Sequence, residues 1–261
     1  MDTLKKKFQK LATQHRKAFI PYIPFGFPTL SLSRQIIKTL DSCGVDVIEL
    51  GMPFSDPVAD GPIIQKASVT ALNRGVTLKL LLENVRQLKK IVSTPIIILT
   101  YYNPVYRYGL NRFFTDCAKS GVSGVMVVDL PIEEAKEYVM CARARKIDTI
   151  FFVTPTTDTV RAKKIIKMSR GFIYYVSVAG ITGPKTIVMK PLLDHLSLMK
   201  KISHLPVCVG FGIHSRQQVR TITRQSDGVI VGSAVVDYIE RHYRQPDFLK
   251  KFSAYIKQFY V

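Results

Sequence analysis

A chain of 261 residues fits the size of one α/β barrel and is long enough to bury a sizeable core. Its hydrophobic fraction of 47% is that of a soluble globular protein, and no apolar run approaches the roughly 20 residues of a membrane helix, so composition excludes a membrane-spanning protein. The 38 Lys and Arg against 19 Asp and Glu give a charge of +19, but without a zinc finger, an RNA-recognition signature or a sustained basic arm this charge predicts a basic surface and no specific nucleic-acid site.

The N-terminal stretch, residues 1–19, contains Lys and Arg but few acids, a composition that transit peptides share. It lacks the apolar core of a secretory signal. We favour a short amphipathic helix, because Leu4, Phe8 and Leu11 fall on one helix face. The four cysteines lie far apart, with no C-x-x-C pair and no metal-ligand spacing, which is typical of a reducing compartment. We therefore expect a cytoplasmic protein that holds no metal.

Short apolar runs rich in β-branched residues recur along the chain and predict eight strands. They cover residues 18–23, 45–50, 94–99, 124–130, 148–153, 171–176, 205–210 and 227–232. Between these runs the apolar spacing becomes helical, for example over 32–40 and 78–88. A further helix is expected to begin near Pro62, directly after the second strand and its loop.

Strands that alternate with helices, many of them almost wholly apolar, indicate a parallel sheet covered on the outside by helices. With eight units, closure into a (β/α)₈ TIM barrel is the simplest arrangement. We predict an α/β protein in which residues 1–261 form one domain, with a short N-terminal helix and an extra helix after the second strand. An open doubly wound sheet is the alternative, but its G-x-G-x-x-G turn is missing, since GFGIHS follows the seventh strand and ends in serine.

The stretch ELGMPFSDPVADGP, residues 49–62, concentrates acidic residues directly after the second strand. Alternation along a strand puts Ile48 and Leu50 on the helix-facing side, so Glu49 points into the mouth of the barrel. Catalytic groups of such barrels lie at this end, and partial desolvation there would raise the pKa of Glu49 into the range useful for proton transfer. The alternative is a structural glutamate paired with a lysine or a backbone amide.

Two further carboxylates follow in the same loop. Asp60 lies just before Pro62, so it is placed either to act on a substrate or to cap the helix that begins there. Asp56 precedes Pro57, a combination that often only shapes a turn. We take Glu49 and Asp60 as the candidate catalytic groups.

Two glycine-rich turns predict a phosphate site. GFG at 210–212 ends the seventh strand, and GSA at 232–234 ends the eighth strand and opens a helix. In barrels these two loops frequently bind phosphate through backbone N–H groups and a helix N-terminus. The segment after the sixth strand, 174–184, has the small residues of a mobile lid. Tyr174 lies inside that strand, where an aromatic residue is usually part of the core.

Six segments together resemble the tryptophan synthase alpha chain family. They are VDVIELGMPFSDPVADGPIIQKA, LTYYNP, GVMVVDLP, YYVSVAGITG, VGFGI and DGVIVGSAVV, and with the first strand the resemblance spans roughly residues 18–240. It implies a barrel that cleaves indole-3-glycerol phosphate to indole and glyceraldehyde 3-phosphate. It also implies no metal, Schiff base or cofactor in this chain, with pyridoxal phosphate expected only in a partner beta chain.

The resemblance also assigns roles to single residues. Glu49 would serve in turn as acid and base, and Asp60 would accept the indole N–H and stabilise positive charge on the ring. The implied substrate contacts are Tyr22, Leu99, Tyr101, Tyr174 and Thr182, and the implied phosphate contacts are Gly183, Gly212, Gly232 and Ser233.

The chain departs from the family pattern at several positions. Pro24, Phe25 and Phe27 stand where many relatives have Thr, a small or aliphatic residue, and Asp. Val178 replaces an arginine of some members, and Pro184 stiffens the lid. The missing acid at position 27 usually helps to order the catalytic loop, so we expect a looser loop with the catalytic groups intact.

The resemblance implies that a tryptophan synthase beta chain docks at the catalytic face in an alpha2-beta2 complex. Met52, Phe54 and Val58 are expected to form a rigid, partly apolar rim there. A stand-alone indole-3-glycerol-phosphate lyase and a weakly active regulatory subunit are the alternatives. Intact Glu49 and Asp60 argue against the regulatory subunit.

Overall fold

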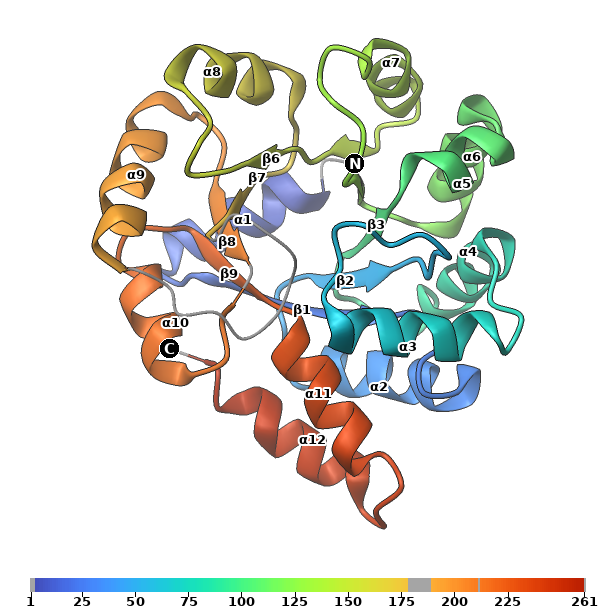
Figure 1. The fold of residues 1–261 in the computed structure, drawn as a ribbon. Helices are drawn as coiled ribbons and strands as arrows, with labels where there is room; N and C mark the ends of the chain where they lie inside the picture. The colour runs from blue at the N-terminus through green and yellow to red at the C-terminus, as the bar shows by residue number, and fades with distance from the viewer. Residues whose placement is uncertain (1–2, 178–188, 211, 261) are drawn as a thin grey trace.

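The computed structural model describes residues 3–177, 189–210 and 212–260, and within them nine strands form one parallel sheet. The strand order is β5-β4-β3-β2-β1-β9-β8-β7-β6 (Figure 1). The bounds are β1 Ala18–Pro24, β2 Ile48–Gly51, β3 Ile96–Thr100, β4 Gly124–Val127, β5 Asp148–Thr149, β6 Phe152–Val153, β7 Ile173–Val176, β8 Val207–Gly210 and β9 Gly228–Val231.

The sheet closes through the predicted strand 148–153, which the structure splits into β5 and β6. β5 pairs with β4, and β6 pairs with β7. The two residues between them continue the ladder, since Ile150 donates its N–H to the Val125 carbonyl and the Phe151 carbonyl accepts the N–H of Tyr174, both at 3.1 Å. The two pieces therefore act as one barrel strand. The predicted α/β TIM barrel of eight strands is confirmed, and the open doubly wound sheet is wrong.

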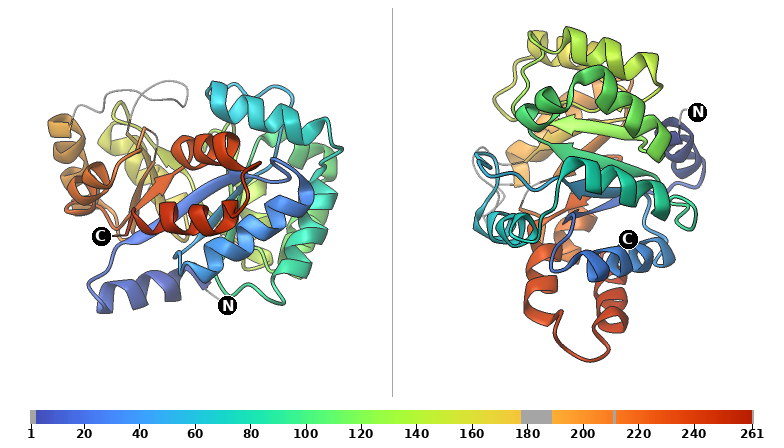
Figure 2. Two further views of the ribbon diagram at one scale, coloured as in Figure 1. Left: turned by 90° about the horizontal axis from the view of Figure 1, so that it is seen from below. Right: turned by 90° about the vertical axis from the view of Figure 1, so that its right-hand side faces the viewer.

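Helices cover the outside of the barrel (Figures 1 and 2). Their bounds are α1 Thr3–Thr13, α2 Leu30–Ser42, α3 Pro62–Leu72, α4 Leu78–Leu88, α5 Tyr102–Tyr108, α6 Leu110–Ser120, α7 Lys136–Ala144, α8 Thr159–Met168, α9 Met189–Ile202, α10 Arg216–Thr223, α11 Ser233–His242 and α12 Phe248–Lys257. The pair α3 and α4 confirms the extra helix after the second strand, and α5 is a second extra helix that the sequence did not predict. No helix in the described part of the chain is long and apolar enough to cross a bilayer.

Local sequence sets where several of these helices begin. Thr29 and Thr77 accept the N–H groups of residues three positions ahead, at the starts of α2 and α4, and Asp158 does the same for α8. Ser215 and Gln218 form a capping box at the start of α10. Each such cap stabilises its helix by about 1 kcal/mol. The local sequence therefore determines the residue at which each of these four helices begins.

The helix α1 closes the N-terminal end of the barrel, and the right-hand view of Figure 2 shows it beyond the strands at that end. Leu4, Phe8 and Leu11 are buried, and the ring of Phe8 lies 5.6 Å from that of Phe172. Leu4 reaches Gly171, whose φ of +81° places it in the left-handed region and where a Cβ would come within 2.9 Å of Leu4 Cδ1. The predicted amphipathic helix is confirmed.

Candidate active site

One cavity at the C-terminal end of the strands gathers most of the predicted site residues. It is lined by Tyr22, Glu49, Asp60, Ile64, Leu99, Tyr174, Gly212, Gly232 and Ser233. All of them except Ile64 are candidates from the sequence. Tyr101 lies behind Asp60 and does not line the cavity, while Thr182 and Gly183 fall outside the described residues.

Glu49 is placed in the cavity by the alternation of β2. Its side chain is buried, and its Oε2 atom has no hydrogen-bond partner among the described residues. Burial, followed by the negative charge of Asp60, raises the pKa of Glu49 to about 8. No lysine or arginine in the described part of the chain forms an ion pair with it, which argues against a structural pairing of Glu49 with lysine. A buried carboxyl group without such a partner is typical of a functional site.

Asp60 is held at the edge of the same cavity. Tyr101 donates its hydroxyl proton to Asp60 Oδ2 at 3.1 Å. Burial raises the pKa of Asp60 to about 6, while the Tyr101 hydrogen bond acts in the opposite direction. The N-cap of α3 is Gly61, which makes no side-chain cap, and Pro62 occupies the first turn. The interpretation of Asp60 as a helix cap is therefore wrong.

The two carboxyl groups titrate in different ranges, for a physical reason. Glu49 is the more deeply buried of the two, whereas Asp60 receives the Tyr101 proton. At pH 7 the higher pKa of about 8 keeps Glu49 protonated, and the lower pKa of about 6 leaves Asp60 mostly ionised. Neighbouring groups whose pKa values are pushed apart in this way divide the roles of acid and anion between them.

Two tyrosines form flat walls of the cavity because glycine lies opposite each of them. A Cβ at Gly51 would collide with the hydroxyl end of Tyr22, and a Cβ at Gly210 would collide with that of Tyr174. Gly232 lies on the other side of Tyr22, where a Cβ would be 3.4 Å from its Cδ1. Tyr174 is buried and faces the cavity, so it belongs both to the core and to the site.

Three of the four predicted phosphate residues, Gly212, Gly232 and Ser233, lie together near the start of α11. Gly232 is the N-cap of this ten-residue helix and Ser233 is its first residue. The first backbone N–H groups of a helix have no partner within it, and they favour an anion together with the helix dipole. Gly212 approaches the same end of the cavity with a φ of +74°, a conformation that glycine adopts without strain.

The residues after β1 that depart from the family pattern are buried in the core. Phe25 and Phe27 are buried, and Phe25 donates its N–H to the Gly51 carbonyl at 2.9 Å. Gly26 donates its N–H to Ser33 Oγ at 3.0 Å. This segment is thus tied to the end of β2 and to α2 without the acid that many relatives carry. Val178 and Pro184 fall outside the described residues.

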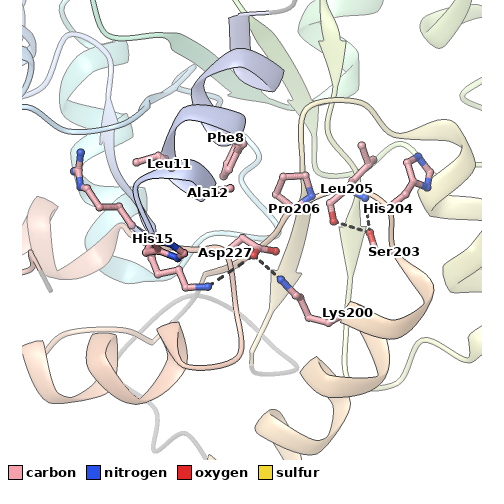
Figure 3. Close-up of a pocket in the computed structure, with 12 residues that line it drawn as sticks. Phe8, Leu11, Ala12, His15, Lys200, Ser203, His204, Leu205, Pro206 and Asp227 are labelled. Carbon is pink, nitrogen blue, oxygen red and sulfur yellow. Dashed lines mark hydrogen bonds and ion pairs between the residues drawn. The ribbon is translucent and has the colours of Figure 1, made fainter.

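Roomier cavities lie at the opposite end of the barrel, beside α1, and Figure 3 shows one of them. There Asp227 forms ion pairs with Lys17 and Lys200 and accepts the Val207 N–H. The charge of Asp227 is already compensated by these two lysines. The active sites of such barrels lie at the C-terminal end of the strands. The cavity with Glu49 and Asp60 is therefore the candidate site. Within the described residues no three His, Cys, Asp or Glu side chains are grouped as metal ligands.

Sequence reasoning missed Ile64, which lines the cavity from α3. The sequence contained a pattern that could have predicted it, because Ile64 lies two residues after Pro62 and shares the buried face of the helix with Ala67 and Ala71. The loop that carries Asp60 thus leads into a helix whose apolar face completes the cavity wall.

Comparison with known proteins identifies the family. The model of the tryptophan synthase alpha chain family matches residues 8–259. The tryptophan synthase alpha chain of Geobacter sulfurreducens is 42% identical over 241 residues, covering 92% of this chain and 91% of the relative. That of Citrifermentans bemidjiense is 39% identical over 256 residues, covering 98% and 96%.

Solved structures agree. The tryptophan synthase subunit alpha from Legionella pneumophila superposes with a TM-score of 0.93 at 34% identity, covering 99% of this chain and 97% of that one. A chain of Mycobacterium tuberculosis tryptophan synthase gives a TM-score of 0.90 at 34% identity, covering 98% and 96%. The chain belongs to the tryptophan synthase alpha chain family.

Proposed function

We propose that this chain is a lyase that cleaves indole-3-glycerol phosphate to indole and glyceraldehyde 3-phosphate, as the alpha subunit of tryptophan synthase. The observation that carries the proposal is the pair Glu49 and Asp60, buried in one cavity that also reaches the N-terminus of α11. Such a cavity presents one substrate with a proton donor in Glu49, a negative charge in Asp60 and a place for a phosphate group at the start of α11.

The two carboxyl groups suit a retro-aldol cleavage. Protonated Glu49 gives its proton to C3 of the indole ring, which leaves positive charge on the ring nitrogen. The Glu49 carboxylate then takes the proton of the glycerol hydroxyl next to the ring. The bond between C3 and the glycerol carbon breaks, its electron pair returns to the ring, and the hydroxyl carbon becomes the aldehyde. Ionised Asp60 stabilises the ring N–H during the cationic stage.

The remaining residues position the substrate. Tyr22, Leu99 and Tyr174 hold the indole ring within the cavity, and Thr182, which falls outside the described residues, is a further proposed contact of the substrate. Gly212, Gly232, Ser233 and Gly183 bind the phosphate through backbone N–H groups and the Ser233 hydroxyl. The reaction needs no cofactor in this chain. Pyridoxal phosphate belongs to the beta partner.

A tryptophan synthase beta chain is the proposed partner, in an alpha2-beta2 complex in the cytoplasm. Val58 is 75% exposed and Tyr106 is 68% exposed, which supports a partly apolar rim for docking. The rim differs from the expected one, because Met52 is buried and Phe54 stacks on the Tyr101 ring. The strands form one sheet, which supports a single domain over residues 1–261. A stand-alone lyase remains the second candidate.

The test is indole release from indole-3-glycerol phosphate by the isolated chain, compared with Asp60→Asn and Asp56→Asn. Asp56 lies in the same loop but is exposed, and its carboxylate accepts the hydroxyl of the neighbouring Ser55. Asp60→Asn should lose at least about a hundredfold in kcat, while Asp56→Asn retains activity. Equal activity of the two variants would overturn the assignment.

Adding the cognate beta chain separates the two candidates. An alpha subunit should be accelerated at least about tenfold, because docking favours the closed state of the site. Full activity that the beta chain leaves unchanged would favour the stand-alone lyase.

A further inference from the structure

Tyr101 occupies a fixed position behind the candidate site. It directly follows β3 and is the N-cap of α5. Its side chain is only 2% exposed, and its ring is stacked on that of Phe54 with the centroids 4.9 Å apart. A ring clamped in this way has little freedom to redirect its hydroxyl group.

The hydroxyl of Tyr101 joins two consecutive residues of the catalytic loop. It accepts the backbone N–H of Ala59 and donates to Asp60 Oδ2, each at 3.1 Å. A phenolic hydroxyl has one proton. Because Ala59 supplies the proton for one of the two bonds, the proton of Tyr101 itself is available to the carboxylate. The chain of donors runs from Ala59 through Tyr101 to Asp60, and each bond polarises the next.

We infer that Tyr101 is a positioning residue, whose hydroxyl fixes the direction of the Asp60 carboxylate and favours its ionised form without touching the substrate. This inference rests on the proposed function of Asp60. It revises the expectation from the sequence that Tyr101 lies against the indole ring, because Tyr101 is not part of the cavity wall.

The described surroundings of Asp60 provide little else that stabilises its ionised form, so the hydrogen bond from Tyr101 has a large effect on its ionisation. Besides Tyr101, the ionisable groups of the described residues that interact with Asp60 lie on three strands, namely Glu49 on β2, Tyr22 on β1 and Tyr174 on β7. None of these is a cation, and no lysine or arginine of the described residues forms an ion pair with Asp60. Burial raises the pKa of Asp60 to about 6 even with the Tyr101 bond in place. Loss of that bond should move the pKa closer to neutrality and reduce the ionised fraction at pH 7.

The experiment compares Tyr101→Phe with Tyr108→Phe. The first variant removes the hydroxyl and keeps the ring that stacks on Phe54. The second is a matched control, because Tyr108 donates its hydroxyl to Asp116 Oδ2 at 2.8 Å, away from the cavity. Both lose one tyrosine-to-aspartate hydrogen bond.

Tyr101→Phe should lower kcat about tenfold, with KM changed less than about threefold, since a bond to a charged group is lost and no substrate contact is removed. The acidic limb of its kcat–pH profile should move up by about one pH unit. Tyr108→Phe should match the wild type in both. A Tyr101→Phe enzyme with the wild-type limb and a kcat within twofold would overturn the inference while leaving the lyase function intact.

A second measurement does not depend on activity. The carboxyl ¹³C signal of Asp60 should titrate at higher pH in Tyr101→Phe than in the wild type, and at the wild-type pH in Tyr108→Phe. If the wild-type chain shows no lyase activity, the proposed function fails, and this titration still decides whether Tyr101 controls Asp60. An unchanged midpoint in Tyr101→Phe would refute that control.

Discussion

Replacing Glu49 by glutamine should nearly abolish cleavage and at the same time make the folded chain more stable. The amide keeps the shape of the side chain but cannot transfer a proton, so kcat should fall by about 10²–10⁴-fold or more. The stability gain follows from the buried carboxyl group. Its folded pKa of about 8 lies above its ordinary value of 4.5, so the folded state binds this proton more tightly than the unfolded state.

The sign and size of that gain depend on pH. Below pH 4.5 both states are protonated and Glu49 adds no pH-dependent cost. As pH rises from there towards the folded pKa of about 8, the unfolded state ionises and the folded state does not, so the wild type loses about 1.4 kcal/mol per pH unit. At pH 7 the accumulated loss is about 3 kcal/mol, which Glu49→Gln should recover.

Urea unfolding at a series of pH values from 4.5 to 9 measures this difference. The free energy of unfolding of Glu49→Gln minus that of the wild type should grow with pH and level off near pH 8. Glu83→Gln is the control, because Glu83 is 55% exposed on α4, and its difference from the wild type should stay within about 0.5 kcal/mol throughout. A difference for Glu49→Gln that does not change with pH would refute the raised pKa, and with it the physical basis for an acid at this position.

Three further outcomes are expected. Ser233→Asp should raise KM for the phosphate substrate strongly, because it sets a negative charge against the dianion at the start of α11; steady-state kinetics with a KM near the wild-type value would contradict the phosphate position. Gly51→Ala should displace the Tyr22 ring and destabilise the chain by about 1–3 kcal/mol, and a urea midpoint equal to that of the wild type would contradict the close packing of these two residues. RNA or DNA should bind to this chain of charge +19 only weakly, without sequence preference and less as salt rises, and retention of a selective complex at physiological salt in a filter-binding assay would show that the charge serves a specific site.

The barrel and the place of Glu49 could be predicted from the sequence because both rest on periodicity. Apolar runs of strand length between helical segments define the eight units, and alternation within β2 is enough to turn Glu49 inward. The ends of the strands are less well determined. Val45 and Val47 are buried although β2 begins at Ile48, so an apolar run continues beyond the ladder itself.

Features that depend on backbone conformation could not be predicted. Whether Asp60 or Gly61 caps α3 depends on which residue takes the extended conformation, and Gly61 does, with φ −82° and ψ 171°. The helix α5 was not predicted because proline usually breaks a helix and Pro104 lies within this segment. Proline is tolerated in the first turn of a helix, which is where Pro104 lies. The hydrogen bond between Tyr101 and Asp60 links residues that are 41 positions apart, and no local sequence pattern predicts it.

The ring of Tyr22 lies between Gly51 at the end of β2 and Gly232 at the start of α11. One side chain therefore touches both neighbours: its hydroxyl end lies against Gly51, and its Cβ, Cγ and Cδ1 are the atoms nearest to Gly232. A Cβ at Gly51 would collide with the ring, whereas a Cβ at Gly232 would make only an ordinary contact. Substitutions at Tyr22 and Gly51 should for this reason be strongly epistatic. A version of this barrel with a differently shaped cavity on this side would have to change Tyr22 and Gly51 together, which makes the position of this ring one of the most constrained features of the site.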